Sequence, residues 1–461
     1  MFLNQPPKKK KFFFIPFVFI PVALIVWILW IFNFFGYRPH IQIQNKISLE
    51  EVSSQEKINL GRGVVVEAEI SVKKGRLCES KLEIKKEGMN YSIQTTPEHQ
   101  IVGKGEKLVF PISLEGMPNM EGDALLLITA KNCSLLPKKQ KYKLQAFIDL
   151  VPPQVSLTSA QHYINQGGAE FATYHTSPDT VWSGIRIGSY EFRGYPRTDK
   201  PKESGDHFAF FVYSYELPAG TPIFVVAKDA AGNEALSPLI PAKFFPKEFR
   251  SRRIDIDDQF INTKVAAIIS QTAGLKSEGD ALKDFLLVNK ELRKTNTQFL
   301  KELSKNSDLT FYWKDAFIPL SNAAINASFA DFRDYYYQDQ KVDSQVHLGF
   351  DLAAIKQYPI ASSAEGKVAF VGYLGIYGNT VIVDHGYGLM TLYGHLTSMD
   401  VHKGDLVHQK QILGKSGETG LAGGDHLHYS LLIQGVQTNP IEFWDQHWID
   451  DHIYLRISPT Y

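Results

Sequence analysis

Residues 377–386 read YGNTVIVDHG and residues 424–428 read GDHLH, and both lie in a region of short apolar runs separated by glycine. Frequent glycine between such runs indicates tight turns in an antiparallel sheet. Side chains alternate faces along a strand, so His426 and His428 are expected to point the same way, about 7 Å apart, with Leu427 in the core. The sequence therefore predicts an antiparallel β-domain over residues 311–461 in which two imidazoles converge.

A second pair of candidate metal ligands consists of His347 and Asp351, in the run HLGFD. A flat strand would separate these two residues by about 13 Å, whereas ligand bonds to zinc are about 2 Å long. Gly349 lies between them and tolerates the backbone angles of a bend. We therefore expect the chain to turn at Gly349. His395, in the run YGHL, adds a further imidazole.

These residue types suit zinc, and a catalytic zinc site uses three protein ligands and keeps one position open. Four histidines and one aspartate exceed that number. The surplus is expected of a hydrolase, because it also needs groups that accept a proton and stabilise the charge on the attacked carbonyl oxygen. We interpret His385, His402 and His408 as turn or surface residues.

Several motifs resemble, in order and spacing, the lysostaphin-type (LytM-like) zinc metallopeptidase domain. They are FADFR at 329–333, HLGFDLA at 347–353, YGNTVIVDHG at 377–386, YGHL at 393–396, GETG at 417–420, HLH at 426–428 and NP at 439–440. The resemblance implies a zinc site with His347, Asp351 and His428 as ligands. It places His395 and His426 beside that site, where one imidazole accepts a proton and the other stabilises developing charge. It also implies a substrate class, the peptides of peptidoglycan.

Residues 12–35 read FFFIPFVFIPVALIVWILWIFNFF, an uncharged run long enough at 1.5 Å per residue to span a hydrocarbon core of about 30 Å. Lysines at residues 8–11 precede the run, which predicts a cytoplasmic basic tail at 1–11 and an exported remainder. A cleaved signal peptide is the alternative, but residues 33–37, NFFGY, offer no small-residue cleavage site. We expect a single-pass anchor in the cytoplasmic membrane, with the bulk of the chain on the periplasmic side.

Two segments after the anchor, residues 38–150 and 151–244, alternate apolar and polar residues in short runs, which predicts β-domains. The phrase IFVVAKDAAGN at 223–233 resembles the last strand and turn of bacterial immunoglobulin-like domains, so we assign both segments to β-sandwiches of that type. Cys78 and Cys133 are the two cysteines of the chain. In an exported segment they are predicted to be bridged, two separate buried thiols being the alternative.

In residues 245–310 the apolar residues recur at intervals of three and four positions. This spacing predicts a helical connector with an amphipathic helix packed on a domain. Its apolar stripe consists of Leu282, Phe285, Leu286, Leu292, Phe299, Leu300 and Leu303. A coiled-coil helix is the alternative, although the stripe is short for one. We hypothesise from position and composition that this helix, or the segment 311–326, covers the metal groove until a partner displaces it.

The composition is that of a folded multidomain protein, with 461 residues, 44% hydrophobic and 21% charged. The net charge of +0 and the absence of an extended basic stripe argue against nucleic acid as a partner. The sequence predicts a mainly β multidomain protein that acts as a zinc-dependent endopeptidase on peptidoglycan stem or cross-link peptides. The alternatives are a non-hydrolytic wall-binding activator of a separate cell-wall amidase, and a protein whose β-domains bind an envelope protein partner.

Overall fold

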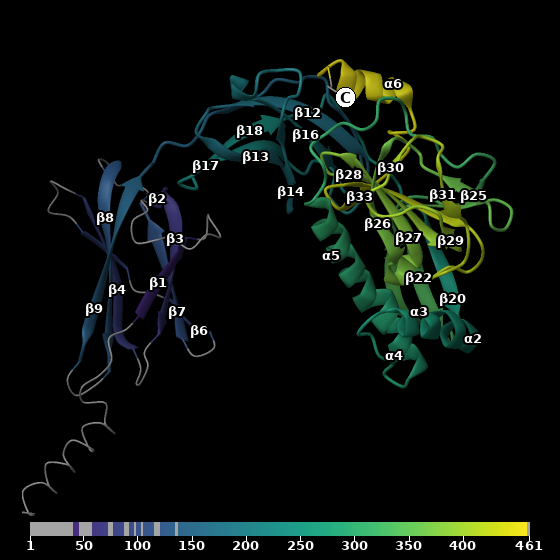
Figure 1. The fold of residues 1–461 in the computed structure, drawn as a ribbon, viewed down its shortest axis with the longest axis horizontal. Coiled ribbons are helices and arrows are strands. Elements are labelled where there is room, and N and C mark those ends of the chain that lie inside the picture. The colour runs from purple at the N-terminus through teal and green to yellow at the C-terminus, as the bar shows by residue number, and fades with distance from the viewer. Residues whose placement is uncertain are drawn as a thin grey trace, which may run out of the picture. The chain divides into compact units, whose positions relative to one another are not determined.

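The computed structural model describes residues 40–45, 58–71, 77–86, 92–95, 98–102, 105–114, 120–133 and 137–458 (Figure 1). This part of the chain is mainly β. It forms two compact units, the first reaching Pro152 and including Lys228–Glu234, the second comprising Pro153–Ala227 and the chain from Ala235 onward. The predicted tail and anchor, residues 1–11 and 12–35, lie outside the described residues. No helix among the described residues has the length and apolar character needed to cross a bilayer.

The first unit contains two antiparallel-rich sheets that share one core. One sheet has the order β1 (His40–Asn45), β3 (Gly63–Ser71), β7 (Gly105–Ser113), β6 (Glu98–Val102). The other has the order β2 (Ile58–Leu60), β9 (Lys139–Ile148), β8 (Gly122–Asn132), β4 (Leu77–Lys86), β5 (Ser92–Thr95). Val66 of the first sheet packs in a cluster with Leu82, Leu126 and Leu144 of the second. A cluster that contains side chains from both sheets is the core expected of two packed sheets.

A disulfide joins Cys78 in β4 to Cys133 just after β8, which confirms the predicted bridge.

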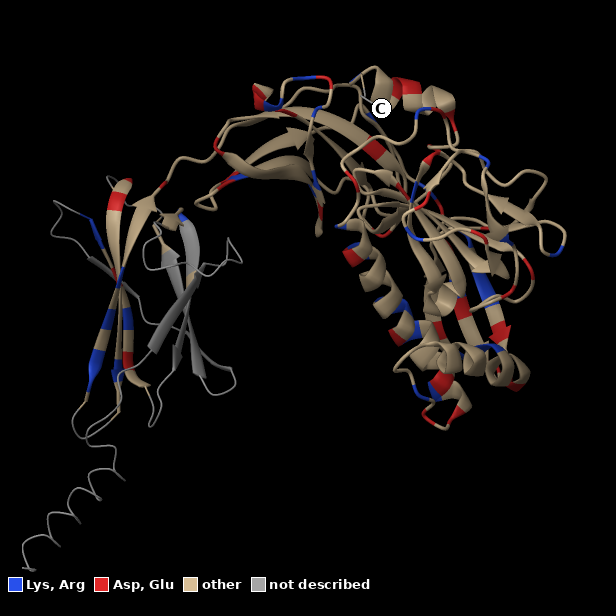
Figure 2. Cartoon of the chain, in the orientation of Figure 1, with Lys and Arg blue, Asp and Glu red and all other residues tan. Residues whose placement is uncertain are grey.

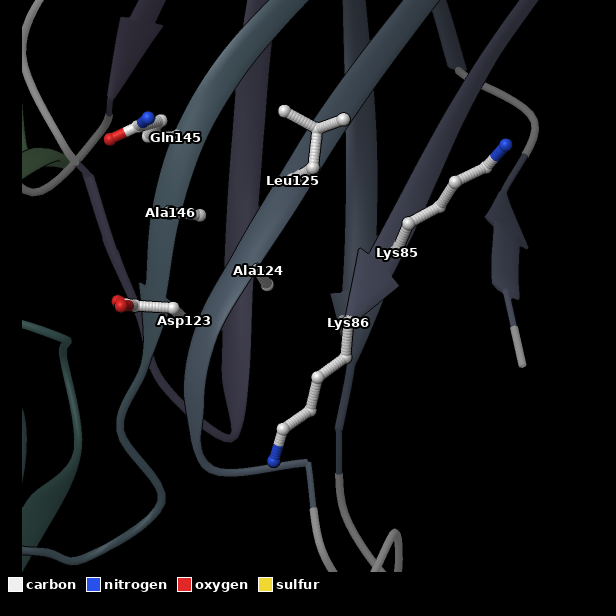
Figure 3. A pocket seen from close by; sticks show the side chains of 7 residues that line it. All are labelled: Lys85, Lys86, Asp123, Ala124, Leu125, Gln145 and Ala146. Carbon is white, nitrogen blue, oxygen red and sulfur yellow. The ribbon is translucent and has the colours of Figure 1, made fainter. Parts of the chain in front are cut away.

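On the same sheet an open pocket of about 450 Å³ is lined by Lys85, Lys86, Asp123, Ala124, Leu125, Gln145 and Ala146. Figure 3 shows the two lysines extending from β4. Its lining includes one carboxylate and no histidine or cysteine, so it offers no metal-binding cluster.

The second unit begins with a β-region built from two four-stranded sheets and a strand pair. The first sheet has the order β10 (Val155–Leu157), β12 (Ala169–Thr176), β16 (Asp206–Val212), β15 (Tyr195–Pro196). The others are β14 (Tyr190–Arg193), β13 (Thr180–Ile187), β17 (Ile223–Asp229), β18 (Glu234–Leu239), and the pair β11 (Tyr163–Asn165) with β19 (Lys243–Phe245). Its core is continuous with later residues, because Phe208 and Phe210 contact Phe311, and Phe210 also contacts Phe443.

The helical segment follows β20 (Ser251–Ile256), a strand inside the stretch predicted as a helical connector. The helices are α2 (Asp258–Phe260), η2 (Ile261–Val265), α3 (Ala266–Gln271), α4 (Ala281–Leu286), η3 (Leu287–Leu292) and α5 (Arg293–Ser304). Asp280 caps α4 by accepting a hydrogen bond from the backbone N–H of Lys283. Phe285 and Leu300 are buried against Ile376 and Leu432 of the last domain. The predicted amphipathic helix packed on a domain is confirmed.

The last domain is built on an eight-stranded antiparallel sheet. Its order is β21 (Ala324–Ala327), β24 (Phe350–Ala353), β32 (Leu427–Ile433), β28 (Leu389–Leu396), β27 (Asn379–Gly386), β26 (Gly366–Tyr373), β30 (Leu406–Val407), with β33 (Val436–Thr438) beside β32. Two three-stranded sheets accompany it, β20 with β22 (Asp331–Tyr337) and β23 (Gln340–His347), and β25 (Pro359–Ala361) with β31 (Ile412–Lys415) and β29 (Ser398–Met399). The short helices α6 (Gln446–Ile449) and η5 (Asp450–Tyr454) end the described chain. The antiparallel sheet predicted for residues 311–461 is confirmed. β20, which lies before that range, adds a strand parallel to β22.

Acidic and basic residues are interspersed along the elements of the second unit, as Figure 2 shows for α5. Glu302 of α5 pairs with Lys305, the residue that follows the helix by one position, at 2.8 Å. Such mixed patterning is expected of an exposed helix face.

Candidate metal centre

Strands distant in the sequence bring the three predicted ligands together. His347 is the last residue of β23, and Asp351 lies in β24, where it is directly opposite His428 of β32. One ligand atom from each residue lies within 4.8 Å of the other two. All three side chains are buried. The three residues therefore form one compact, largely dry cluster.

The chain bends between His347 and Asp351 because it leaves one sheet and enters another. β23 belongs to a three-stranded sheet and β24 to the eight-stranded sheet. Gly349 lies at this bend, as predicted, but without a left-handed φ. A Cβ there would come within 2.7 Å of the His428 ring and 2.6 Å of the Tyr429 carbonyl oxygen. Glycine is therefore needed here for close approach, and not for a left-handed φ.

His395 reaches the cluster through a bulge in β28. Asn379 pairs with Leu396 and Val381 with Tyr393, so two residues of β28 oppose one of β27. A bulge of this kind re-aims a side chain. His395 also has a φ of 64°, in the left-handed region that a non-glycine residue rarely adopts. Its ring centroid lies 4.8 Å from that of His426. Such strained residues concentrate at functional sites.

Three of the four histidines are held by backbone carbonyl oxygens outside the cluster. Their Nδ1 atoms donate at 2.8 to 3.1 Å as follows: His347 to Ser328, His395 to Thr419, and His426 to Gly424. A carbonyl oxygen only accepts, so Nδ1 carries the hydrogen in each ring. The neutral imidazole therefore keeps a lone pair on Nε2, the atom that faces the cluster.

His428 has the opposite tautomer because its outer partner is a hydroxyl. Nε2 of His428 lies 3.0 Å from Oγ of Ser430, and that hydroxyl donates its hydrogen to the Leu348 carbonyl at 2.7 Å. Ser430 has no second hydrogen to give, so Nε2 of His428 must be the donor between the two. The lone pair of His428 is then on Nδ1, facing Asp351.

Three electron-rich atoms thus face one another. Nε2 of His347 and Nδ1 of His428 are 3.0 Å apart, and they lie 2.8 and 3.0 Å from Oδ1 of Asp351. Lone pairs at this separation repel each other unless a cation lies among them. Adjacent ligand atoms around a tetrahedral zinc ion with bonds of about 2.1 Å are about 3.4 Å apart. The donor set and its spacing fit one divalent metal ion.

The electrostatics of the cluster favour an ionised Asp351 and a neutral His428. Burial opposes ionisation of Asp351, but His347 and the other imidazoles hold its pKa well below the usual range. Nη2 of Arg333 adds a hydrogen bond to Oδ2 of Asp351 at 3.0 Å. Burial lowers the pKa of His428 to about 4. Asp351 and His428 therefore have the protonation states that metal ligands require.

The two other imidazoles differ in their proton affinity. Burial, together with neighbouring His426 and His428, holds the pKa of His395 well below its ordinary value. Burial also acts on His426, but the hydrogen bond and negative charge of Asp351 outweigh it and raise the pKa of His426. Nε2 of His426 is 3.4 Å from Oδ1 of Asp351. The structure thus gathers all five residues, and the assignment of ligand and catalytic roles among them stays a prediction.

Residues 345–440 match the model of peptidase family M23. The chain carries a peptidase family M23 domain at its C-terminus. This agrees with the lysostaphin-type resemblance of the motifs, and the matched residues include all five members of the cluster.

Relatives of known name match this M23 domain. The DD-carboxypeptidase/endopeptidase Mpg of Neisseria meningitidis serogroup B is 39% identical over 97 residues, 21% of this chain and 22% of that protein. The peptidoglycan DD-endopeptidase ShyA of Vibrio cholerae serotype O1 is 38% identical over 96 residues, again 21% and 22%. The chain spans about a fifth of the length of these relatives. The catalytic domain of lysostaphin from Staphylococcus simulans is 23% identical, with a TM-score of 0.21, over 32% of this chain and 96% of that one.

The pocket at the centre of the M23 domain has a volume of about 100 Å³. Besides the five predicted residues, its lining consists of Arg293, Arg333, Ile376, Tyr377, Leu421 and Gly423. Arg333 and Tyr377 stand within the family-like motifs, but nothing in the sequence showed that they meet at the centre. Arg293 comes from the helical segment. No described residue of the segment 311–326 lines the pocket, so the hypothesis that this segment covers the groove has no support here.

Three histidines outside the centre were predicted to lie in turns or on the surface, and two of them do. His402 is 93% exposed and His408 is exposed, as expected. The prediction of a turn or surface position for His385 is wrong, because its side chain is fully buried in β27. Its ring nitrogens contact the Glu365 carbonyl oxygen and Oγ1 of Thr391. A polar side chain can be buried when both of its nitrogens have partners.

Proposed function

We propose that the protein is a zinc-dependent endopeptidase that hydrolyses peptide bonds in the stem or cross-link peptides of peptidoglycan. The observation that carries the proposal is the convergence of two imidazole lone pairs and a carboxylate oxygen on one point, with two further imidazoles beside it. The similarity to relatives that include a peptidoglycan DD-endopeptidase supports the substrate class.

In this proposal His347, Asp351 and His428 hold the metal. Zinc in such a site acts as a Lewis acid that activates water and polarises a carbonyl group. Arg333 positions the carboxylate of Asp351, and Ser430 fixes the ring of His428. Fixed outer partners of this kind orient ligands and raise their basicity.

His395 and His426 would carry out the proton transfers. In each ring Nδ1 is committed to a carbonyl oxygen, so Nε2 remains to accept a proton from water and to return it to the departing amine. A protonated imidazole also stabilises negative charge on the attacked carbonyl oxygen. Burial of His395 keeps its imidazole neutral and therefore able to accept a proton at neutral pH.

The proposed location is the cytoplasmic membrane, with the folded units on its periplasmic side. The apolar run at residues 12–35 would anchor the chain there. The disulfide between Cys78 and Cys133 supports an exported location, because disulfides persist outside the reducing cytoplasm. The substrate of the enzyme is found in the same compartment.

The decisive experiment compares the full-length chain with Asp351→Ala and with Asp400→Ala, whose carboxylate is exposed on the same domain. Zinc content is measured by mass spectrometry, and soluble peptide fragments released from purified sacculi are quantified. The wild type and Asp400→Ala should bind zinc and release fragments in a chelator-sensitive manner. Asp351→Ala should bind no zinc, and its activity should be more than about 100-fold lower than that of the wild type, because a metal ligand is removed.

Absence of release by the zinc-loaded wild type would contradict the proposal. Stimulation of a purified cell-wall amidase by wild type and Asp351→Ala alike would instead identify the chain as an activator. Both results are obtained by measuring the fragments released from sacculi with and without added amidase.

A further inference from the structure

Arg293 is the one residue of the helical segment that lines the metal pocket. It is the first residue of α5 and is half-buried. Its Nε donates a hydrogen bond to Oδ1 of Asn289 at 3.0 Å. Asn289 is fully buried and donates in turn to Oδ2 of Asp343 at 2.9 Å. The buried side chain of Asn289 therefore fixes the Nε edge of the Arg293 guanidinium. This contact also sets the direction of the two Nη atoms.

The positive charge of Arg293 has no counter-ion within the described part of the chain. Arg333, the other arginine of the pocket, is paired with Asp351 at 3.0 Å, whereas none of the described carboxylates lies within 4.0 Å of Arg293. Asp343 already accepts hydrogen bonds from Asn289 and Gln345. A half-buried cation without a partner is unfavourable unless a ligand supplies one.

The helix that carries Arg293 packs closely against the M23 domain. Asn296, one turn further along α5, is buried and accepts a hydrogen bond from the backbone N–H of Ile376 at 3.1 Å. Gly375 has a φ of 47°, and a Cβ there would lie 2.5 Å from Oδ1 of Asn296. Tyr377, in the same loop, also lines the pocket. Arg293 and Tyr377 therefore line the same pocket from two elements that are hydrogen-bonded to each other.

We propose that Arg293 binds a carboxylate of the substrate, so that the site selects peptides with a free carboxylate close to the bond that is cleaved. This inference rests on the proposed peptidase function. A guanidinium offers two parallel N–H groups to a carboxylate, an arrangement that a neutral amide does not match. The carboxylate is supplied either by the free C-terminus of a stem peptide or by the side chain of a diacid residue within it.

The test uses synthetic cross-linked stem peptides in three forms. All carboxylates are free in the first form, the terminal α-carboxylates are amides in the second, and the side-chain carboxylates are amides in the third. Zinc-loaded full-length wild type, Arg293→Gln and Arg293→Lys are compared by kcat/KM. The control is Lys294→Gln, which removes a neighbouring exposed charge paired with Glu291 at 3.0 Å. Thermal unfolding establishes that each variant is folded.

Wild type and Lys294→Gln should cleave one of the two amidated forms at least about tenfold more slowly than the free form, since a charge-assisted hydrogen bond contributes about 1.5 kcal/mol or more. The slower form identifies the source of the carboxylate. Arg293→Gln should cleave all three forms at similar rates, and Arg293→Lys should recover part of the preference. Equal rates for wild type on all forms, or an undiminished preference in Arg293→Gln, would overturn the inference while the peptidase function stands.

A binding measurement separates this inference from the peptidase function. The chelator-treated chain is titrated with the free-carboxylate peptide in a calorimeter, where no hydrolysis occurs. Binding by Arg293→Gln should be at least about tenfold weaker than binding by wild type. Equal affinities would overturn the inference. Failure of zinc-loaded wild type to cleave any form would count against the peptidase function instead.

Discussion

At the scale of single residues, the centre depends on small side chains that are not ligands. Ser430 contacts Nε2 of His428 and passes its own hydrogen to the Leu348 carbonyl oxygen. That one hydroxyl decides which nitrogen of His428 has a free lone pair. The strand alternation of His426 and His428 was visible in the sequence. The partner of His428 on the far side of its ring was not visible there.

Replacement of Ser430 by alanine should weaken metal binding about 10- to 100-fold, because the His428 ring loses the partner that fixes its tautomer. Competition with a chromophoric chelator measures this change. Ser344→Ala, which removes an exposed hydroxyl on β23, is the matched control and should bind metal like the wild type. An unchanged affinity in Ser430→Ala would show that the hydrogen bond does not set the tautomer.

At the scale of elements, α5 and the loop at Gly375–Tyr377 form one wall of the metal pocket. Asn296 connects them through the backbone N–H of Ile376. The sequence predicted an amphipathic helix packed on a domain, since its apolar residues recur at intervals of three and four residues. The polar contacts on the same face of the helix could not be predicted, because they depend on a loop about 80 residues further along the chain.

Asn296→Ala should lower the free energy of unfolding by about 1–3 kcal/mol, because it leaves the buried N–H of Ile376 without a partner. Urea denaturation followed by tryptophan fluorescence measures the loss. Gln298→Ala, on the exposed face of the same helix, should change stability by less than about 0.5 kcal/mol. Equal effects of the two substitutions would mean that Asn296 does not hold the loop.

At the scale of the whole molecule, residues predicted as three successive domains lie in one compact unit. Glu442, just after the residues matched to family M23, is buried and accepts hydrogen bonds from Nδ2 of Asn165 at 2.9 Å and from the backbone N–H of Ala169. Burial raises the pKa of Glu442 to about 8, the two hydrogen bonds oppose the rise, and the negative charge of Glu170 adds to it. A side chain near the C-terminus thereby joins the preceding β-region.

The raised pKa of Glu442 predicts that the folded state loses stability as the pH rises from about 4.5 to about 8. The folded state holds the proton between about 4.5 and about 8, where the unfolded state has released it, so the free energy of unfolding falls as the pH rises through that window. The slope from this group is at most about 1.4 kcal/mol per pH unit. Urea denaturation at pH 5 and pH 8 should show a flatter dependence for Glu442→Gln than for wild type or the exposed control Glu248→Gln. Parallel curves for all three proteins would contradict this assignment.

The two units should respond to different reagents in calorimetry. Reduction of the Cys78–Cys133 bond should destabilise the first unit by about 2–5 kcal/mol. Chelator should lower only the transition of the second unit, because a ligand stabilises the part of the chain that binds it. A chelator effect on both transitions, or a reductant effect on the second alone, would contradict this division of the molecule.

Local sequence by itself determined the antiparallel β character of the last domain, the amphipathic helix, the disulfide partners and the five residues of the centre. Each of these follows from period, composition, pairing of the chain's two cysteines, or short motifs whose members are close in sequence. Tertiary structure alone decided that Asp351 lies opposite His428, that Arg333 holds the carboxylate, that Arg293 enters the pocket and that Glu442 is buried. These contacts join residues on separate elements, and local periodicity contains no information about which elements become neighbours.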